Sequence, residues 1–141
     1  MCKNSKNLLK TSDIFFANNL LEAINIQNYY VILYPNRYNN MFFIEKTYEF
    51  DKWLRKQKDL KAKAKILFRI QKIESEGHFG DCKHVGNGIR ELRINFSKGY
   101  RVYFKERNGK IIVLLIGGNK STQQKDIEKA KDIWKELNNK I

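Results

Sequence analysis

From residue 41 onward, apolar and polar positions recur with two different periods along the chain. Residues 42–50 (FFIEKTYEF) alternate and predict a strand, whereas residues 51–77 carry apolar side chains at helical spacing. A break at Asp59-Leu60 divides this stretch into two helices that can pack antiparallel, and Gly77 is a natural helix end. The apolar positions of the second helix are Ile66, Leu67, Ile70 and Ile73.

The C-terminal half of the chain predicts three strands and a last helix. Residues 78–88 contain three glycines and two histidines and predict a loop. Residues 92–96 and 101–105 then alternate between apolar and polar side chains, as half-buried strands do. Asn108-Gly109 predicts a hairpin, because both residues tolerate a positive φ.

The hairpin leads into residues 111–118 (IIVLLIGG), which are apolar on both faces and indicate a strand buried between layers. Residues 121–141 predict a helix that begins at Ser121 or Thr122 and buries one apolar face. The predicted order is therefore β-α-α-β-β-β-α. The fold class is α+β, with an antiparallel sheet and the helices against one side of it.

Composition changes near residue 40 and indicates two regions. Residues 1–40 are rich in Asn and Tyr, poor in charge, and contain Pro35, the single proline of the chain. A short helix and a strand (YYVILY) are predicted there, without recognisable chemistry. The interpretation is an N-terminal extension of unknown role at 1–40, followed by a domain at 41–141.

Charge points to a polyanionic partner. The 141 residues include 28 Lys and Arg against 15 Asp and Glu, a net charge of +13. Residues 1–40 contribute only +2, so residues 41–141 hold +11, which favours nucleic acid or an acidic protein. No stretch approaches the ~20 apolar residues of a membrane span. Two distant cysteines without metal-ligand spacing favour free thiols, and a cytoplasmic protein is expected.

The two alternating strands place arginine and tyrosine side chains on one face of the sheet. If their apolar side chains meet the helices, Arg93, Arg101 and Tyr103 point to the other, open side. Lys120 lies at the rim of that face, after the last strand. Guanidinium groups bind phosphate oxygens through two hydrogen bonds and stabilise charge in a phosphoryl transition state. The alternative is that the arginines form ion pairs with Glu91, Glu106 or a helix.

Several motifs follow one another in the second half of the chain: GDCK, ELR after a glycine, GYRVYF, and GGNKSTQ followed by DIEKA. In this order they resemble the RelE/ParE toxin superfamily, and more narrowly its HigB-like branch of addiction-module killer proteins. The resemblance covers residues 42–137. It implies a RelE-like twisted antiparallel sheet with two N-terminal helices and one C-terminal helix.

The resemblance also implies a toxin of a type II toxin–antitoxin system that acts as an mRNA endoribonuclease on the ribosome. Neither a metal nor another cofactor is expected, since the 2′-hydroxyl of RNA attacks the adjacent phosphate. The expected partners are mRNA, the ribosome and a cognate antitoxin. The antitoxin is expected to be a helix-turn-helix DNA-binding protein, through which the complex binds operator DNA. The catalytic positions carried over are Arg93, Arg101, Tyr103 and Lys120, and the RNA-binding positions are Lys83, His84 and Lys105.

Two other functions stay open at this point. One is a ParE-type inhibitor of DNA gyrase without enzymatic activity, and the other is an inactive toxin homologue. The nuclease hypothesis depends on a single arrangement, in which the guanidinium groups of Arg93 and Arg101 share the uncovered face of the sheet. Burial of both groups beneath a helix, or engagement with acidic neighbours, would count against it.

Overall fold

The structure is a computed structural model, and it describes residues 41–140. The helix and strand predicted within residues 1–40 lie outside the described residues, as does Ile141. The division at residue 40 therefore stays a prediction.

The described part opens with a short strand and two helices. Strand β1 (Phe43–Lys46) leads into α4 (Tyr48–Arg55), and α5 (Leu60–Glu76) follows. The predicted strand at 42–50 is too long, because the Thr47 hydroxyl accepts a hydrogen bond from the Phe50 amide at 3.0 Å and starts α4 there. The predicted break is confirmed, since the Asp59 side chain caps α5 through the Ala62 amide. Gly77 ends α5 with a left-handed φ of 65°.

The remaining elements are four strands and two helical segments. They are β2 (Cys82–Gly86), β3 (Ile89–Ile94), β4 (Tyr100–Arg107), β5 (Ile111–Asn119), the 3₁₀ turn η2 (Lys120–Thr122) and α6 (Gln123–Asn139). The prediction of a loop over 78–88 is wrong in its second half, because β2 pairs antiparallel with β3. The Asn108-Gly109 hairpin is confirmed, and both residues have positive φ.

Within residues 41–140 the strands form one five-stranded sheet in the order β1-β5-β4-β3-β2. Strands β2 to β5 are antiparallel neighbours, whereas β1 runs parallel to β5, with Phe43 opposite Ile111. The sheet is therefore mixed rather than wholly antiparallel. The helical pair α4 and α5 separates β1 from the other strands in sequence and leaves β1 free to join at the β5 edge.

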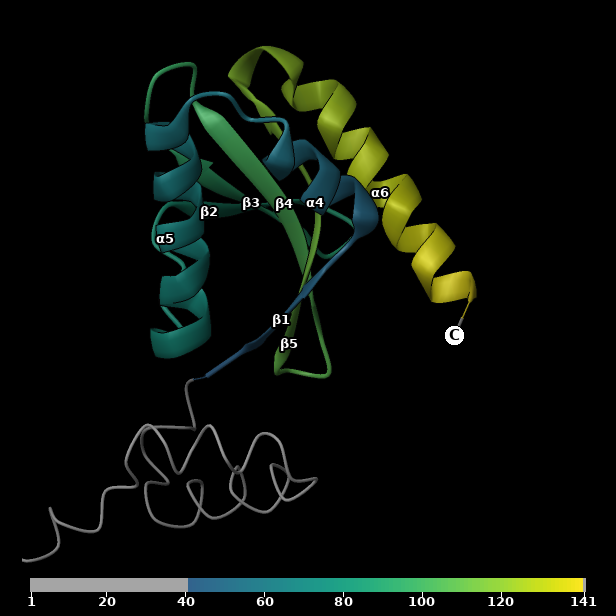
Figure 1. The fold of residues 1–141 in the computed structure, drawn as a ribbon. Coiled ribbons are helices and arrows are strands. Elements are labelled where there is room, and N and C mark those ends of the chain that lie inside the picture. Colours follow the sequence, from purple (N-terminus) through teal and green to yellow (C-terminus); the bar gives the residue numbers. More distant parts are fainter. Residues whose placement is uncertain (1–40, 141) are drawn as a thin grey trace, which may run out of the picture. The chain divides into compact units, whose positions relative to one another are not determined.

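Both faces of the sheet are covered, as Figure 1 shows with α5 and α6 on opposite sides of the strands. Helices α4 and α5 pack on one face, where Leu92, Val102 and Phe104 are fully buried. Helix α6 packs on the other face through Ala130 and Ile133. The expectation that the helices lie against one side is therefore wrong. The α+β class is confirmed, with α6 over the face that was predicted to be open.

Two glycines let both layers approach β5. A Cβ atom on Gly117 would lie 2.2 Å from the ring of Trp53 in α4. A Cβ atom on Gly118 would collide with the carboxylate of Asp126 in α6. The Gly-Gly sequence therefore sets how closely the two helices meet this strand, next to the end that carries Lys120.

Candidate functional site

Arg93 and Arg101 lie side by side, on the face that α6 partly covers. They are directly opposite each other in the β3–β4 pair, so their side chains leave the sheet on the same side. Arg101 is buried, with 7% of its surface exposed, whereas Arg93 is about one-third exposed. The predicted juxtaposition is confirmed, but the two groups do not form a free pair on an open surface.

A buried polar network holds Arg101. Its Nε lies 3.6 Å from Oε1 of Glu91, a carboxylate that is fully buried. The other carboxylate oxygen of Glu91 accepts hydrogen bonds from the Tyr103 hydroxyl at 3.0 Å and from the Gln123 amide at 2.8 Å. Gln123 belongs to the first turn of α6, so this helix helps to fix the carboxylate that faces Arg101.

Arg93 is held by a different carboxylate at the edge of the sheet. Its Nη2 and Nε atoms lie 2.8 and 3.0 Å from Oδ1 of Asp81. The side chain of Asn95 donates to the other oxygen of Asp81 at 3.2 Å. Each predicted arginine therefore has its own acidic partner. The pair of Arg101 with Glu91 is one that the alternative interpretation of the sequence named, whereas Asp81 was not among the partners it named.

Tyr103 does not line an open surface. Its side chain is fully buried in the cluster beneath α6, where its hydroxyl binds Glu91. Burial, together with the Glu91 carboxylate, raises the pKa of the Tyr103 hydroxyl far above its ordinary value. The expectation that this ring is exposed on the sheet is wrong, because α6 occupies the space above it. In this arrangement Tyr103 supports the network around Arg101.

Arg101 and Lys120 meet at a hollow of about 360 Å³ beside the β3–β4 turn. The lining residues are Asn95, Phe96, Ser97, Lys98, Gly99, Arg101 and Lys120. The Lys120 amide donates to the Gly99 carbonyl at 2.8 Å, which brings the end of β5 against the turn. Three cationic side chains thus border one concavity whose lining contains no carboxylate. Such a hollow suits a phosphate group.

The predicted RNA-binding residues are dispersed. Lys83 pairs with Glu91 in the β2–β3 register and is exposed on the same face as the arginines. His84 pairs with Arg90, whose guanidinium stacks over Phe79 on the α5 face. His84 is therefore on the opposite side of the sheet from Arg101, because the predicted loop that was to carry it over is a strand.

Lys105 shares the face of Arg101 but not its hollow. Its ammonium group donates to the Asn87 carbonyl at 2.8 Å and lies 4.7 Å from the ring centre of Trp134. Of the predicted residues, the structure thus brings Arg101 and Lys120 together at one concavity, with Arg93 beside them.

Sequence reasoning missed three residues of this region, which are Asp81, Lys98 and Gln123. It named Glu91 only as an ion-pair partner. A signal existed for Lys98, because it lies in the SKG turn between the two arginine-bearing strands. No sequence signal pointed to Gln123, since its hydrogen bond to Glu91 depends on the position of α6.

Among residues 41–140, no helix is long and apolar enough to cross a bilayer. In the same residues, no group of three His, Cys, Asp or Glu side chains is placed to hold a metal ion.

Comparison with known proteins places the chain in a family. Residues 52–135 match the family described as phage derived protein Gp49-like, which is more than half of the chain. The chain belongs to this family. A Haemophilus influenzae protein described as uncharacterized is 54% identical over 94 residues, which cover 67% of this chain and 94% of that protein. The Gp49-like region contains the arginines, the hollow and most of α6.

A solved structure shares the fold of this Gp49-like protein. The free state of an arginine-substituted mutant of the Escherichia coli toxin RelE matches with a TM-score of 0.53 and 16% identity. The match covers 66% of this chain and 98% of that chain. It confirms the predicted RelE-like fold. The narrower HigB-like assignment stays a prediction.

Proposed function

We propose that this chain is the toxin of a toxin–antitoxin system and cleaves mRNA on the ribosome without a metal ion. The observation that carries the proposal is the hollow where Arg101, Lys98 and Lys120 converge in a strongly basic chain. The RelE-like fold and membership of the Gp49-like family support it. A cognate antitoxin and the cytoplasm, where translation occurs, are part of the same proposal.

In the proposed reaction, the 2′-hydroxyl of RNA attacks the adjacent phosphorus and the bond to the 5′-oxygen of the next nucleotide breaks. The products are a 2′,3′-cyclic phosphate and a free 5′-hydroxyl. Negative charge builds on the phosphorane oxygens, and cations in a preformed hollow stabilise that charge more than the ground state. Arg101 is positioned for this by the Glu91 carboxylate, while Lys98 and Lys120 are exposed at the rim.

The arrangement of Glu91 explains how Arg101 can serve despite its ion pair. Glu91 already accepts two hydrogen bonds, and its separation from Arg101 Nε is long at 3.6 Å. The Nη1 atom lies on the other side of the guanidinium, where its hydrogen bond to the Tyr100 carbonyl is also long at 3.4 Å. A phosphate in the hollow would offer this guanidinium a better acceptor.

The proposal is tested with purified chain, ribosomes and a defined mRNA, followed by mapping of the RNA ends. Arg101→Ala is expected to lower the cleavage rate by about 10²- to 10³-fold, the usual loss when a transition-state donor is removed. Arg107→Ala is the matched control, since Arg107 is on the same strand but pairs with Glu45 at 2.6 Å. Melting curves establish that each variant is folded.

Because Arg101 is buried, a second variant avoids the risk of unfolding. Lys98→Ala combined with Lys120→Ala alters only exposed side chains and is expected to weaken cleavage at unchanged stability. Full activity in both the arginine and the lysine variants would refute the assignment.

A second candidate is a non-enzymatic inhibitor of DNA gyrase. The observation that favours it is that Arg93 and Arg101 each engage a carboxylate, as structural arginines do. It predicts growth arrest with a DNA-damage response and intact transcripts. Breaks within translated reading frames after brief expression would exclude it.

A further inference from the structure

We propose that a basic cleft between α4 and α6 binds a free nucleoside triphosphate. The cleft has a volume of about 620 Å³, which is within the range of small-molecule sites. Two lysines from each helix line it, namely Lys52 and Lys56 from α4 and Lys125 and Lys129 from α6. The end of β5 lies between the two helices.

The cleft exists because β5 is longer than its parallel neighbour. Strand β1 pairs with β5 as far as Leu114, and Thr47 then donates to the Leu115 carbonyl at 2.6 Å as the chain turns into α4. Within the described residues, the end of β5 therefore has no strand on this side. Gly117 lines the cleft, where its missing side chain makes room for the ring of Trp53. Helices α4 and α6 form the walls.

The four lysines of the cleft are available to a ligand. All four are exposed, and in residues 41–140 none of them forms an ion pair. On each wall the two lysines are four residues apart, so both side chains leave the helix on the side that lines the cleft. Cations on both walls suit a chain of phosphates better than a single phosphate.

The cleft also offers an aromatic ring to a base. Tyr48 is 68% exposed, and the ammonium group of Lys52 lies 5.9 Å from its ring centre. Stacking on such a ring tolerates any base, because every base has a π-face. Glu49 lines the cleft next to Tyr48 and can accept a hydrogen bond from the amino group of a base.

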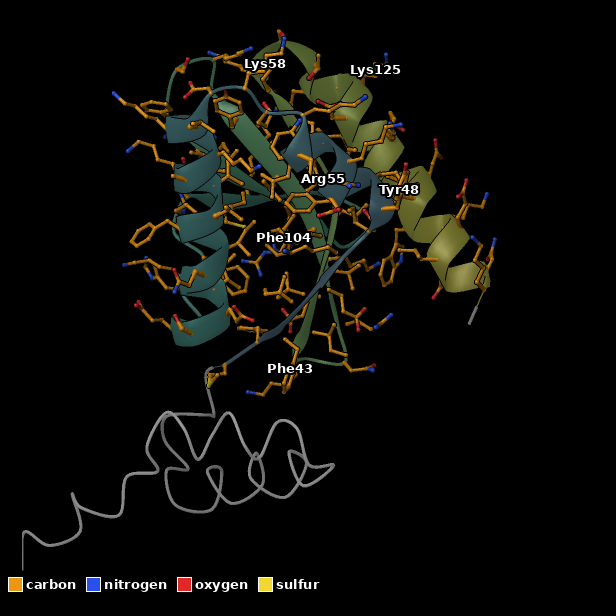
Figure 2. All side chains as sticks on the ribbon, in the orientation of Figure 1. Phe43, Tyr48, Arg55, Lys58, Phe104 and Lys125 are labelled. Atoms are coloured by element: carbon orange, nitrogen blue, oxygen red, sulfur yellow. The ribbon has the colours of Figure 1, made fainter. Side chains whose placement is uncertain are left out.

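The aromatic and the cationic parts of the cleft are separated along α6. Figure 2 marks Lys125 and Lys58, which follows Lys56 by two residues, at one end of the described chain, and Tyr48 farther along α6. A base stacked on Tyr48 would therefore direct its phosphates towards Lys56 and Lys125. The carboxylate of Asp126 also lines the cleft, but it accepts a hydrogen bond from the hydroxyl of the α6 cap and packs over the end of β5.

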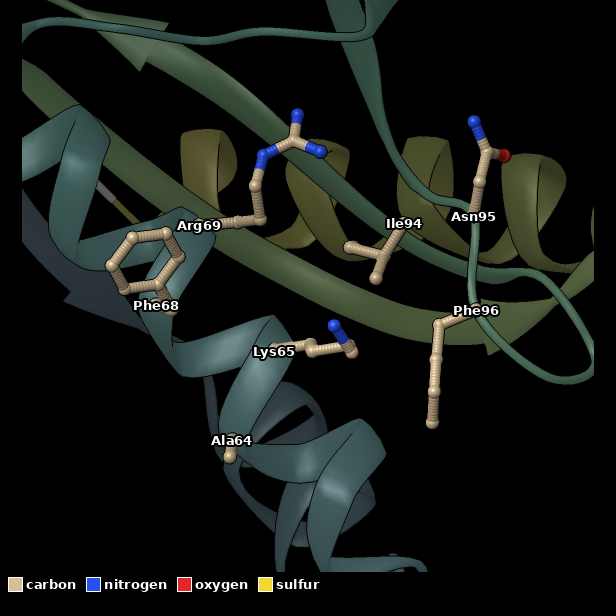
Figure 3. Close-up of a pocket in the computed structure, with 7 residues that line it drawn as sticks. All are labelled: Ala64, Lys65, Phe68, Arg69, Ile94, Asn95 and Phe96. Atoms are coloured by element: carbon tan, nitrogen blue, oxygen red, sulfur yellow. The ribbon is translucent and has the colours of Figure 1, made fainter.

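A second concavity of similar size lacks these features. The groove between α5 and the β3–β4 turn, drawn in Figure 3, has a volume of about 650 Å³. Phe68, Ile94 and Phe96 are in its lining, and one of its two cations, Arg69, already donates to the Phe79 carbonyl at 2.7 Å. That groove offers little to a triphosphate, so it is an internal reference for the location of binding.

A bound nucleotide would act on the candidate phosphate site through η2. Lys120, at the start of η2, borders the hollow with Arg101, and Thr122, at its end, lines the cleft. A triphosphate beside Thr122 brings negative charge within a three-residue turn of Lys120 and would weaken RNA binding in the hollow. This regulation rests on the proposed function, whereas nucleotide binding itself does not.

The test titrates the full chain with ATP, inorganic triphosphate and adenosine. Calorimetry gives the dissociation constants, and amide chemical shifts locate the binding site. We expect ATP to bind at least about fivefold more tightly than inorganic triphosphate, because the base adds stacking to the charge of the phosphates. Adenosine, without phosphates, should bind more weakly than either. Shifts are expected at Tyr48, Gly117 and Lys125.

Tyr48→Ala and Phe43→Ala test the place of the base, since both remove an exposed ring. Tyr48→Ala is expected to weaken ATP binding by about tenfold and to change the binding of inorganic triphosphate by less than about twofold. Phe43→Ala should leave both dissociation constants within about twofold.

Two double variants test the place of the phosphates. Lys56→Gln with Lys125→Gln should weaken both ATP and inorganic triphosphate by about tenfold or more. Lys61→Gln with Lys135→Gln removes the same charge away from the cleft and should cost less than about twofold, because distant charges are screened. All four lysines are exposed, so folding is not at risk.

The proposal is overturned if ATP does not bind, or binds no more tightly than inorganic triphosphate. Shifts centred on Phe68 and Phe96, or equal losses within either matched pair of variants, would overturn it as well. An RNA oligonucleotide that displaces ATP and shifts the same amides would assign the cleft to an RNA strand instead. Arg101→Ala should bind ATP normally, so failure of the nuclease proposal is distinguishable from failure of the cleft.

Discussion

On one face of the sheet, α4 and α5 meet a mainly apolar surface, where the guanidinium of Arg90 stacks over Phe79 and Phe104, whereas on the other face α6 covers a carboxylate, a guanidinium and a phenol. The fully buried side chains on the first face include Leu92, Val102 and Phe104, and these side chains contain no polar atom that needs a hydrogen-bond partner. On the second face, Glu91 is fully buried and Arg101 is 7% exposed, and these two charged groups depend on one another and on Tyr103. The first face is specified by shape and the second by hydrogen bonds and charge, which is where we place the candidate site.

The largest loss of stability is expected on the apolar face. Phe104→Ala leaves a cavity beneath α5 and removes the stacked contact with Phe79, whose ring centre is 5.6 Å away. We expect the free energy of unfolding to fall by about 4 kcal/mol, measured by urea denaturation. Phe43→Ala, at an exposed ring, should cost less than about 1 kcal/mol; Figure 2 marks both residues. Similar losses in the two variants would contradict the proposed role of Phe104.

Removing the charge of Glu91 is the next test, because it breaks the polar face without changing its shape. Glu91→Gln leaves Arg101 buried beside a neutral amide, and the expected cost is about 3 kcal/mol. Glu45→Gln is the control, since Glu45 pairs with Arg107 at the surface and should contribute about 0.5 kcal/mol.

Glu91→Gln should also affect cleavage more than stability explains, because the guanidinium loses the group that orients it. The readout is the rate at saturating RNA, measured with variant that is fully folded. A rate equal to that of the unaltered chain would show that Glu91 serves folding alone.

The hydroxyl of Tyr103 gives a smaller effect with a distinct pH signature. Tyr103→Phe removes one hydrogen bond to Glu91 and should cost about 1 kcal/mol near neutral pH. Burial raises the pKa of this tyrosine in the folded chain, so its stabilising contribution is complete below the ordinary value near 10 and declines as the pH rises above it.

Above pH ~10 the unaltered chain should therefore lose up to about 1.4 kcal/mol per pH unit through this group, and Tyr103→Phe should lose less. Tyr48→Phe, which removes the hydroxyl of an exposed ring, is the control. Parallel slopes for Tyr103→Phe and the unaltered chain would show that the network does not protect this hydroxyl.

The sequence made the strand pattern around Arg93 and Arg101 predictable, since alternation assigns side chains to faces. It did not reveal which face a later helix covers, because Glu91 alternates identically whether α6 lies above it or not. Strand β2 was missed for a local reason: its residues include His84 and Gly86, and the register shifts between these two. The prediction started α4 too late, because Thr47 and Tyr48 continue the apolar–polar alternation of β1. The structure shows instead that the Thr47 side chain caps α4.

The same limit applies to the candidate site. Arg101 and Lys120 were predictable because a strand face and a strand end are local features. The ion pair of Arg101 with Glu91 was anticipated as an alternative, but the pair of Arg93 with Asp81 was not, since Asp81 reaches Arg93 only through the pairing of β2 with β3. Burial of Tyr103 likewise depends on α6, which follows twenty residues later in the sequence.

The smallest expected effect on stability concerns the exposed edge of the polar face. Asp81→Asn breaks the ion pair with Arg93, and because both side chains are about one-third exposed it should cost less than about 1 kcal/mol. The change frees the Arg93 guanidinium for RNA phosphate, so we expect RNA binding to strengthen by about twofold, the equivalent of a surface ion pair. Asp51→Asn is the matched control, because it removes the same charge from the Arg55 pair in α4. The dissociation constant of RNA, measured by filter binding, is compared between the two variants. If both variants bind equally well, Arg93 belongs to the structural edge of the sheet, and Arg101 with its two lysines is the whole of the phosphate site.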